Sequence, residues 1–177
     1  MKIKDLAETA LCSALIAVCS WIMIPGPVPF TLQTAGVFFT LFTLGGVKGT
    51  ISVLVYILLG IIGLPVFSGF GSGISVILGP TGGYIVGFLA TGICVCIGDI
   101  VRKKTGLKKI YTQIISMLAG LIVCYSLGTV WYMSVKGGGG AASVLWACVF
   151  PFVIPDILKL LIAYKISSRI SKTLKNI

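Results

Sequence analysis

The sequence contains no histidine and only four acidic residues. Histidine is the side chain most often used for general acid–base chemistry near neutral pH and for binding zinc, so its absence argues against enzymes and metal sites that depend on it. The six cysteines all lie in apolar stretches, where a free thiol behaves as a small apolar residue. We therefore predict that the chain is not an enzyme, and we expect no catalytic residue, metal ion or cofactor.

Charged residues are also scarce, at 10% of the chain against about 25% in an ordinary soluble domain, whereas 57% of the residues are hydrophobic. These proportions predict an all-α integral membrane protein. A net charge of +10 would fit a nucleic-acid partner. However, the bases cluster in short segments between apolar stretches, as lysine and arginine do on the cytosolic side of membrane proteins. We expect contact with membrane lipid and not with nucleic acid.

Six apolar stretches predict six transmembrane helices in a compact bundle that forms a single domain over residues 1–177. Their approximate bounds are residues 6–24, 31–44, 50–63, 84–100, 113–133 and 144–164. With both termini in the cytosol, all 14 bases are cytosolic except two, Lys136 outside and Lys159 within the membrane. The positive-inside bias therefore predicts a multi-pass protein of the cytoplasmic membrane with cytosolic termini.

The last apolar stretch carries Asp156 and Lys159, although an ionised group at membrane depth costs roughly 2.5–3.5 kcal/mol on insertion scales. Their spacing of three residues places both on one helical face. Pro151 and Pro155 each remove a backbone donor, a common device where a membrane helix bends around a cavity. Two interpretations follow: a structural ion pair that holds the bundle together, or a site that grips a polar substrate.

The stretch at residues 64–83 is the least helical part of the sequence, with six glycines among apolar residues. Glycine permits left-handed backbone and close approach, while the apolar residues argue against a flexible linker. We expect an ordered, glycine-rich extracellular loop folded onto the bundle, either as a plain connection or as a lid over a binding site. It is not a phosphate-binding loop, because no Gly-Lys-Ser/Thr follows its glycines, so any ATP-driven cycle requires other chains.

Ala10 and Ala14 form a strip of small residues on the first predicted helix, extended by Ala7 and Ala17. Such a strip lets another helix approach closely. That helix belongs either to the same bundle or to a partner subunit, and the strip alone leaves both open.

Several motifs follow one another in a recognisable order. They are Pro27-Val-Pro-Phe-Thr-Leu-Gln-Thr34, Tyr56 before Leu59-Gly60, Gly63-Leu-Pro-Val-Phe67, Leu78-Gly-Pro-Thr-Gly-Gly-Tyr84 with Gly87-Phe88, Tyr125-x-x-Gly128-x-x-Trp131, and Pro155-Asp156-x-x-Lys159. Together they cover most of the chain, and the run from Leu78 to Tyr84 is the most specific. In these motifs the sequence resembles the biotin-specific substrate-binding (S) component of energy-coupling factor transporters, the BioY family.

The resemblance implies a six-helix S component that binds biotin from outside. Such proteins dock on an energy-coupling transmembrane subunit that is driven by two cytosolic ATPase subunits. Ala10 and Ala14 resemble the small-residue motif with which the family meets that subunit. The substrate-binding residues expected on this basis are Asp156, Lys159, Gln33, Tyr56, Phe67, Gly71, Gly73 and Tyr84.

The chemistry of biotin agrees with these residues. Its ureido ring has two N–H donors and one carbonyl acceptor, which suit Asp156 as an acceptor and Lys159 as a donor. Neutral hydrogen bonds and aromatic cover would come from a second set of residues: Gln33, Thr34, Tyr56, Tyr84, Phe67 and Trp131.

Two alternatives stay open from the sequence. One is an S component for a different small vitamin, and the other is a ligand-free membrane assembly subunit in which Asp156 and Lys159 form only a structural pair. An intramembrane enzyme is disfavoured, because Asp156 is the only acid expected at membrane depth and histidine is absent.

Overall fold

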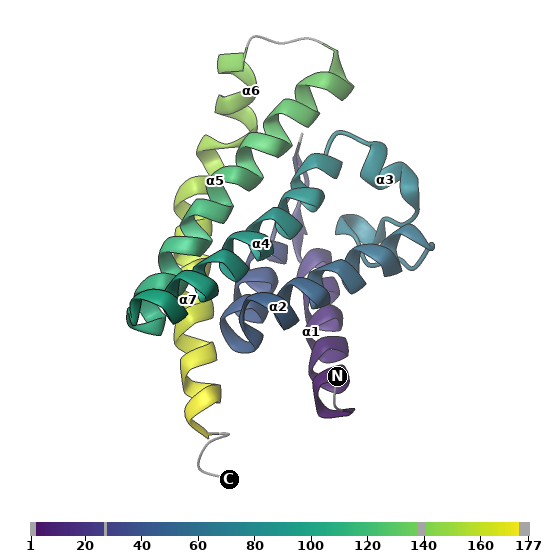
Figure 1. Cartoon of the computed structure of the whole chain (residues 1–177). Helices are drawn as coiled ribbons and strands as arrows, with labels where there is room; N and C mark the ends of the chain where they lie inside the picture. The colour runs from purple at the N-terminus through teal and green to yellow at the C-terminus, as the bar shows by residue number, and fades with distance from the viewer. Residues whose placement is uncertain (1–2, 27, 138–140, 174–177) are drawn as a thin grey trace.

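Helices dominate the structure because long apolar stretches satisfy their backbone hydrogen bonds internally, as a membrane interior demands. The computed structural model describes residues 3–26, 28–137 and 141–173, and Figure 1 shows long helices packed side by side with a smaller loop region at one side. The elements in chain order are α1 (Ile3–Trp21), β1 (Met23–Ile24), β2 (Phe30–Thr31), α2 (Gln33–Ile61), η1 (Ser68–Phe70), α3 (Ile74–Leu78), α4 (Gly82–Thr105), α5 (Lys109–Lys136), α6 (Ala141–Cys148) and α7 (Phe150–Thr173).

Apolar composition and length qualify four helical segments of the described chain as membrane spans. They are Gln33–Ile61, Gly82–Thr105, Lys109–Lys136 and Ala142–Ile170. The last of these joins α6 and α7.

Helix α2 consists of two arms that fold back on each other at Gly45. Gly45 has a φ of 79° and a ψ of −177°, which interrupts the helix. A side-chain carbon added at Gly49 would lie 3.1 Å from the Cα atom of Leu41, whereas eight residues of straight helix rise about 12 Å. The carboxylate of Asp99 accepts the N–H of Gly46 at 2.9 Å and so satisfies a free donor at the start of the second arm. The predicted spans at residues 31–44 and 50–63 are therefore separated by a turn, as their bounds require.

Helices α4 and α5 form a close antiparallel hairpin in which each supplies glycines to the interface. A side-chain carbon at Gly87 would lie 2.9 Å from the Cα atom of Cys124, and one at Gly120 would lie 2.7 Å from the Cα atom of Thr91. Thr91 Oγ1 also donates a hydrogen bond to the carbonyl of Gly120 at 3.1 Å. Small residues thus let the two backbones approach closely, which replaces the hydrophobic driving force that lipid does not supply.

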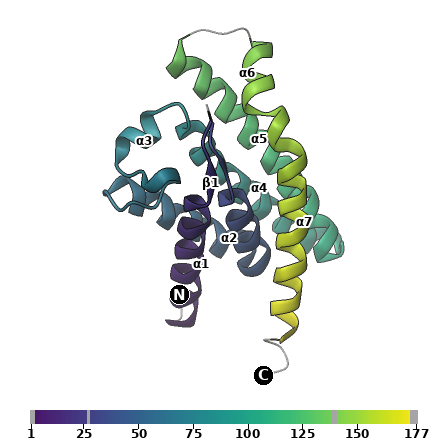
Figure 2. The same cartoon turned by 180° about the vertical axis from the view of Figure 1, so that it is seen from behind.

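The first predicted helix, residues 6–24, ends earlier than expected. Helix α1 stops at Trp21, and β1 pairs antiparallel with β2 so that Met23 lies opposite Thr31. The reason is local, because the residue before a proline avoids helical backbone and Ile24 precedes Pro25. Figure 2 shows this hairpin rising from the end of α1 beside the start of α2.

The last predicted helix, residues 144–164, is interrupted. Helix α6 ends at Cys148 and α7 begins at Phe150, which makes Pro151 the second residue of α7, where a missing backbone N–H is tolerated. Pro155 lies inside α7. The two helices follow one another along the same side of the bundle (Figure 2). The four consecutive glycines at residues 137–140 also predict a turn before this span, and residues 138–140 lie outside the described residues.

The segment at residues 64–83 is ordered and tied to the long helices by hydrogen bonds from tryptophan side chains. Trp21 at the end of α1 donates to the carbonyl of Pro65 at 2.8 Å, and Trp131 on α5 donates to the carbonyl of Gly79 at 2.9 Å. The segment contains η1 and α3, which Figure 1 shows beside the far end of α2.

Candidate functional site

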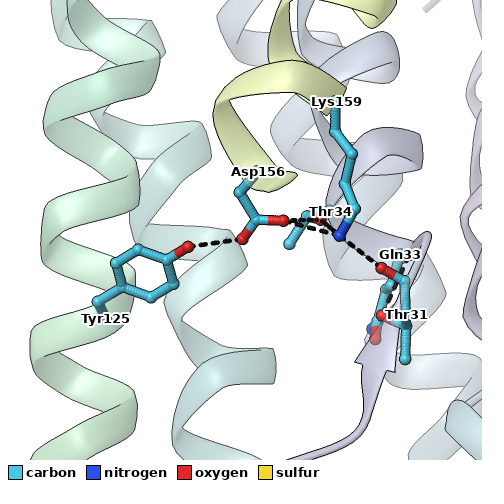
Figure 3. A network of polar contacts seen from close by, with 6 residues as sticks. All are labelled: Thr31, Gln33, Thr34, Tyr125, Asp156 and Lys159. Carbon is cyan, nitrogen blue, oxygen red and sulfur yellow. Dashed lines mark hydrogen bonds and ion pairs between the residues drawn. The ribbon is translucent and has the colours of Figure 1, made fainter. Parts of the chain in front are cut away.

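Asp156 and Lys159 both point into the bundle from α7 rather than toward its outer surface. Asp156 is 1% exposed and Lys159 is 7% exposed, and the lysine Nζ atom lies 2.8 Å from the aspartate Oδ1 atom. Figure 3 shows both side chains between α7, the β2–α2 junction and α5. Two buried charges of opposite sign therefore lie where three parts of the chain meet.

The ammonium group of Lys159 uses all three of its donors within the protein. Besides Asp156, it donates to the carbonyl of Thr31 at 2.7 Å and to Oγ1 of Thr34 at 3.1 Å. Its Nζ atom also lies 4.1 Å from the ring centroid of Phe30, a cation–π distance. The β-hairpin positions Phe30 and Thr31 under this amine, and no pattern in the sequence indicated that contact.

The carboxylate of Asp156 accepts from two further side chains. Thr34 Oγ1 donates to Oδ1 at 2.8 Å, and the hydroxyl of Tyr125 donates to Oδ2 at 2.7 Å (Figure 3). Sequence reasoning named Thr34 as a possible ligand but assigned Tyr125 no role. The available signal was that a buried carboxylate needs donors, and Tyr125 is a polar residue within a neighbouring apolar stretch.

Gln33, Tyr56 and Phe67 form a second group next to the first. Gln33 Nε2 donates to the hydroxyl of Tyr56 at 2.7 Å, and the rings of Tyr56 and Phe67 meet edge to face with centroids 5.6 Å apart. The backbone N–H of Gln33 also donates to Oγ1 of Thr31, whose carbonyl holds Lys159. The structure therefore connects these three predicted residues to the charged pair.

Gly71 and Gly73 hold the loop against this second group. The carbonyl of Gly71 accepts the N–H of Phe67 at 3.0 Å, and the N–H of Gly73 donates to the carbonyl of Gly60 at 2.7 Å. Gly73 has a left-handed φ of 84°, whereas Gly71 has a φ of −63°. A side chain at Gly60 would collide with the ring of Phe67. Phe67 is thereby enclosed between α2 and the loop.

Tyr84 lies at the start of α4, close to Tyr125. Its hydroxyl is buried, and neither it nor Oγ1 of Thr129 has a hydrogen-bond partner within the described chain. Tyr125 packs against the cluster that contains Tyr84 and Cys148. Tyr84 is therefore connected to the charged pair through Tyr125, which bonds to Asp156. The hydroxyl oxygen of Tyr84 is the atom without a partner. Trp131, by contrast, is partly exposed, and its indole N–H donates a hydrogen bond to the carbonyl of Gly79 in the loop.

Ala10 and Ala14 lie on the outer face of α1. Both are exposed, as is Ala7, whereas Ala17 is buried in the core. The bundle itself approaches α1 elsewhere, where Gly36 of α2 packs against Ile16. Ala7, Ala10 and Ala14 are therefore not covered by the described part of this chain, whereas the expected extension of the strip to Ala17 lies inside the bundle.

Comparison with known proteins identifies a family that matches nearly the whole chain. The model of the BioY family matches residues 1–176. The chain belongs to the BioY family.

Two BioY relatives match this chain along nearly their full lengths. The chain is 41% identical over 171 residues to the biotin transporter BioY of Thermotoga maritima, with 96% of each chain covered. It is 39% identical over 172 residues to the probable biotin transporter BioY of Pyrococcus horikoshii, covering 96% of this chain and 98% of that one. In three dimensions it matches the crystal structure of the S-component for biotin from an ECF-type ABC transporter, with a TM-score of 0.83, 30% identity, and coverage of 97% and 92%.

Proposed function

We propose that this BioY protein binds biotin and takes it up across the cytoplasmic membrane as the S component of an energy-coupling factor transporter. The observation that carries the proposal is the match to a biotin transporter over 96% of both chains. It is supported by the shared fold with a biotin S-component and by the polar network around Asp156 and Lys159.

The hydroxyl of Thr34 indicates how the ureido ring would bind. This one group donates to Asp156 and accepts from Lys159, so it bridges the two charges. A ureido ring offers an N–H donor beside a carbonyl acceptor, which is the same pair of functions. We infer that biotin takes over these two bonds, with its N–H on Asp156 and its carbonyl on Lys159, because all three donors of Lys159 are already used within the protein.

The remaining predicted ligands surround this point. The unpartnered hydroxyl of Tyr84 is a donor that a polar part of biotin would satisfy. Gln33 and Tyr56 would supply further neutral hydrogen bonds. The apolar cover would consist of Phe67, Gly71 and Gly73, since these residues hold the loop against Tyr56 and the end of α2.

Six membrane crossings follow if the break at Gly45 separates two spans. The qualifying helical segments then supply five crossings, and the 19 residues of α1, about 28 Å long, supply the sixth. With cytosolic termini, the loop at residues 64–83 and the β-hairpin lie outside, above the charged pair. The site would therefore receive biotin from the extracellular side.

The uncovered alanine strip fits a helix of the energy-coupling transmembrane subunit, with two cytosolic ATPase subunits supplying the energy. Enlarging the strip as Ala10→Leu/Ala14→Leu should abolish co-purification with that subunit and leave biotin binding unchanged. The double variant changes only the exposed face of α1, because the buried Cys12 between the two alanines is not substituted. Retained co-purification would contradict this assignment of the surface.

The central test identifies the molecule carried by the purified protein. Protein from cells grown with biotin is denatured, and the released compound is analysed by mass spectrometry. Biotin at about one molecule per chain is the expected result. Release of another vitamin would contradict the substrate assignment, and release of no ligand, together with no binding of added biotin, would favour a ligand-free assembly role.

A second test separates a binding pair from a structural pair. The double variant Asp156→Asn/Lys159→Gln replaces two charges by two amides that still bond to each other, so that no unpaired charge is left buried. We expect this protein to fold, as judged by its thermal unfolding, and to bind biotin more than tenfold more weakly. Parental biotin affinity in the folded double variant would show that the charges serve only the bundle.

A further inference from the structure

A groove of about 460 Å³ lies between α4 and α5, at the opposite end of this hairpin from Tyr84. Its floor is the contact between Gly98 and Ser116, where any larger residue in place of the glycine would collide with the serine. Its walls are mostly apolar and exposed, and they include Ile97, Val101, Leu107, Tyr111 and Ile115. The groove is separate from the biotin site, and nothing in the proposed transport function uses it.

Two lysines lie where the groove reaches the end of the hairpin. Lys104 comes one turn after Val101 on α4, so helical geometry places it on the groove side. Lys108 directly precedes α5 and follows Leu107, which lines the groove. Both are exposed, and neither forms an ion pair in the part of the chain that the structure describes. The nearby Arg102 is instead 3.8 Å from Asp99.

We propose that this groove binds one anionic phospholipid of the cytosolic leaflet, with an acyl chain between α4 and α5 and the phosphate between Lys104 and Lys108. The apolar walls alone would not make the groove hold one lipid more tightly than the surrounding lipids, because lipid tails are as apolar as the side chains. Selectivity therefore comes from the phosphate, which bases at the cytosolic surface attract. The proposal rests on the membrane orientation proposed above and is independent of the biotin site.

The test uses the full chain in nanodiscs that contain phosphatidylglycerol and phosphatidylcholine, followed by native mass spectrometry of the retained lipid. The parent should retain one phosphatidylglycerol in preference to phosphatidylcholine. Lys104→Gln/Lys108→Gln should weaken this retention by about fivefold for each lysine removed. The control Lys103→Gln/Lys109→Gln changes the net charge equally, on other faces of the same helices, and should retain lipid like the parent. Equal losses in both variants, or equal retention of the two lipids, would overturn the proposal.

Filling the groove tests the acyl chain separately from the headgroup. Ala119 lines the groove, whereas Leu118 is exposed on α5 and does not. Ala119→Phe should abolish phosphatidylglycerol retention, while Leu118→Phe should not. Retention that survives Ala119→Phe, or a dimer of the chain that this variant disrupts, would overturn the lipid assignment. Biotin binding should be unchanged in all four variants, so that a failure here is distinguishable from a failure of the proposed transport function.

Discussion

Two ion pairs in this protein have the same chemistry and opposite surroundings. The side chains of Lys159 and Asp156 are 8% and 2% exposed, and four neighbouring groups complete their contacts. The side chains of Lys48 and Asp5 are 39% and 22% exposed, and their Nζ and Oδ1 atoms are 2.5 Å apart, with Glu8 at 3.8 Å. Distance therefore does not distinguish the two pairs, whereas burial does.

The comparison shows what each pair contributes. A buried charge has given up its hydration, so removing its partner leaves a large uncompensated cost. An exposed charge that loses its partner returns to water, and the loss is small and screened by salt. We therefore expect the pair at Asp156 to couple substrate binding to bundle stability, whereas the pair at Lys48 only joins α1 to the turn of α2.

The largest effect is expected from breaking the buried pair. Lys159→Ala leaves the carboxylate of Asp156 buried with only hydroxyl donors, which should cost about 3–5 kcal/mol of unfolding free energy. Biotin binding should weaken more than tenfold. Thermal unfolding and equilibrium binding of labelled biotin measure the two effects. A variant as stable as the parent would show that the pair is hydrated after all.

A smaller effect is expected when the pair keeps both charges and loses one neutral donor. Tyr125→Phe removes the only hydroxyl bonded to Oδ2 of Asp156 in the described chain, which should cost about 1–3 kcal/mol. Tyr111→Phe on the same helix removes an exposed hydroxyl and serves as the control. Equal melting temperatures for the two variants would contradict a structural role for the Tyr125 bond.

Disturbing the packing around Phe67 should lower the stability by a similar amount without any change of charge. Gly60→Ala introduces a methyl group that collides with the Phe67 ring, and overpacking of this kind typically costs about 1–3 kcal/mol. The loop at residues 64–83 should loosen, which protease digestion would detect. The double variant Gly60→Ala/Phe67→Leu should recover part of the stability, because leucine leaves more room. A double variant less stable than Gly60→Ala alone would contradict the steric explanation.

The smallest effect is expected at the exposed pair. Lys48→Gln should leave the melting temperature within experimental error and biotin binding unchanged, since both partners remain hydrated. Measurements at low and high salt should agree for this variant, while the parent should show a slight dependence on salt. A loss of stability as large as that of Lys159→Ala would overturn the distinction between the two pairs.

The sequence predicted much of the fold because helical spans depend on local composition. The turn at Gly45, the long helices α4 and α5, and the irregular segment at residues 64–83 all follow from glycine, charge and apolar length. The early end of α1 was missed because its signal, a residue before proline, competes with an apolar stretch that favours helix. Pro151 and Pro155 indicated a bend in the last helix, but the interruption before Phe150 was not predicted, because it lies within continuous apolar sequence.

For the site, the sequence by itself determined which residues carry unusual chemistry: two charges in an apolar stretch, a glycine-rich segment and a strip of alanines. Only the tertiary structure decided that Tyr125, Thr34 and the carbonyl of Thr31 complete the charged pair, and that Ala10 and Ala14 face outward. The physical reason is that an isolated charge at membrane depth is conspicuous from composition alone. The donors and acceptors that balance it come from distant elements, whose meeting depends on packing.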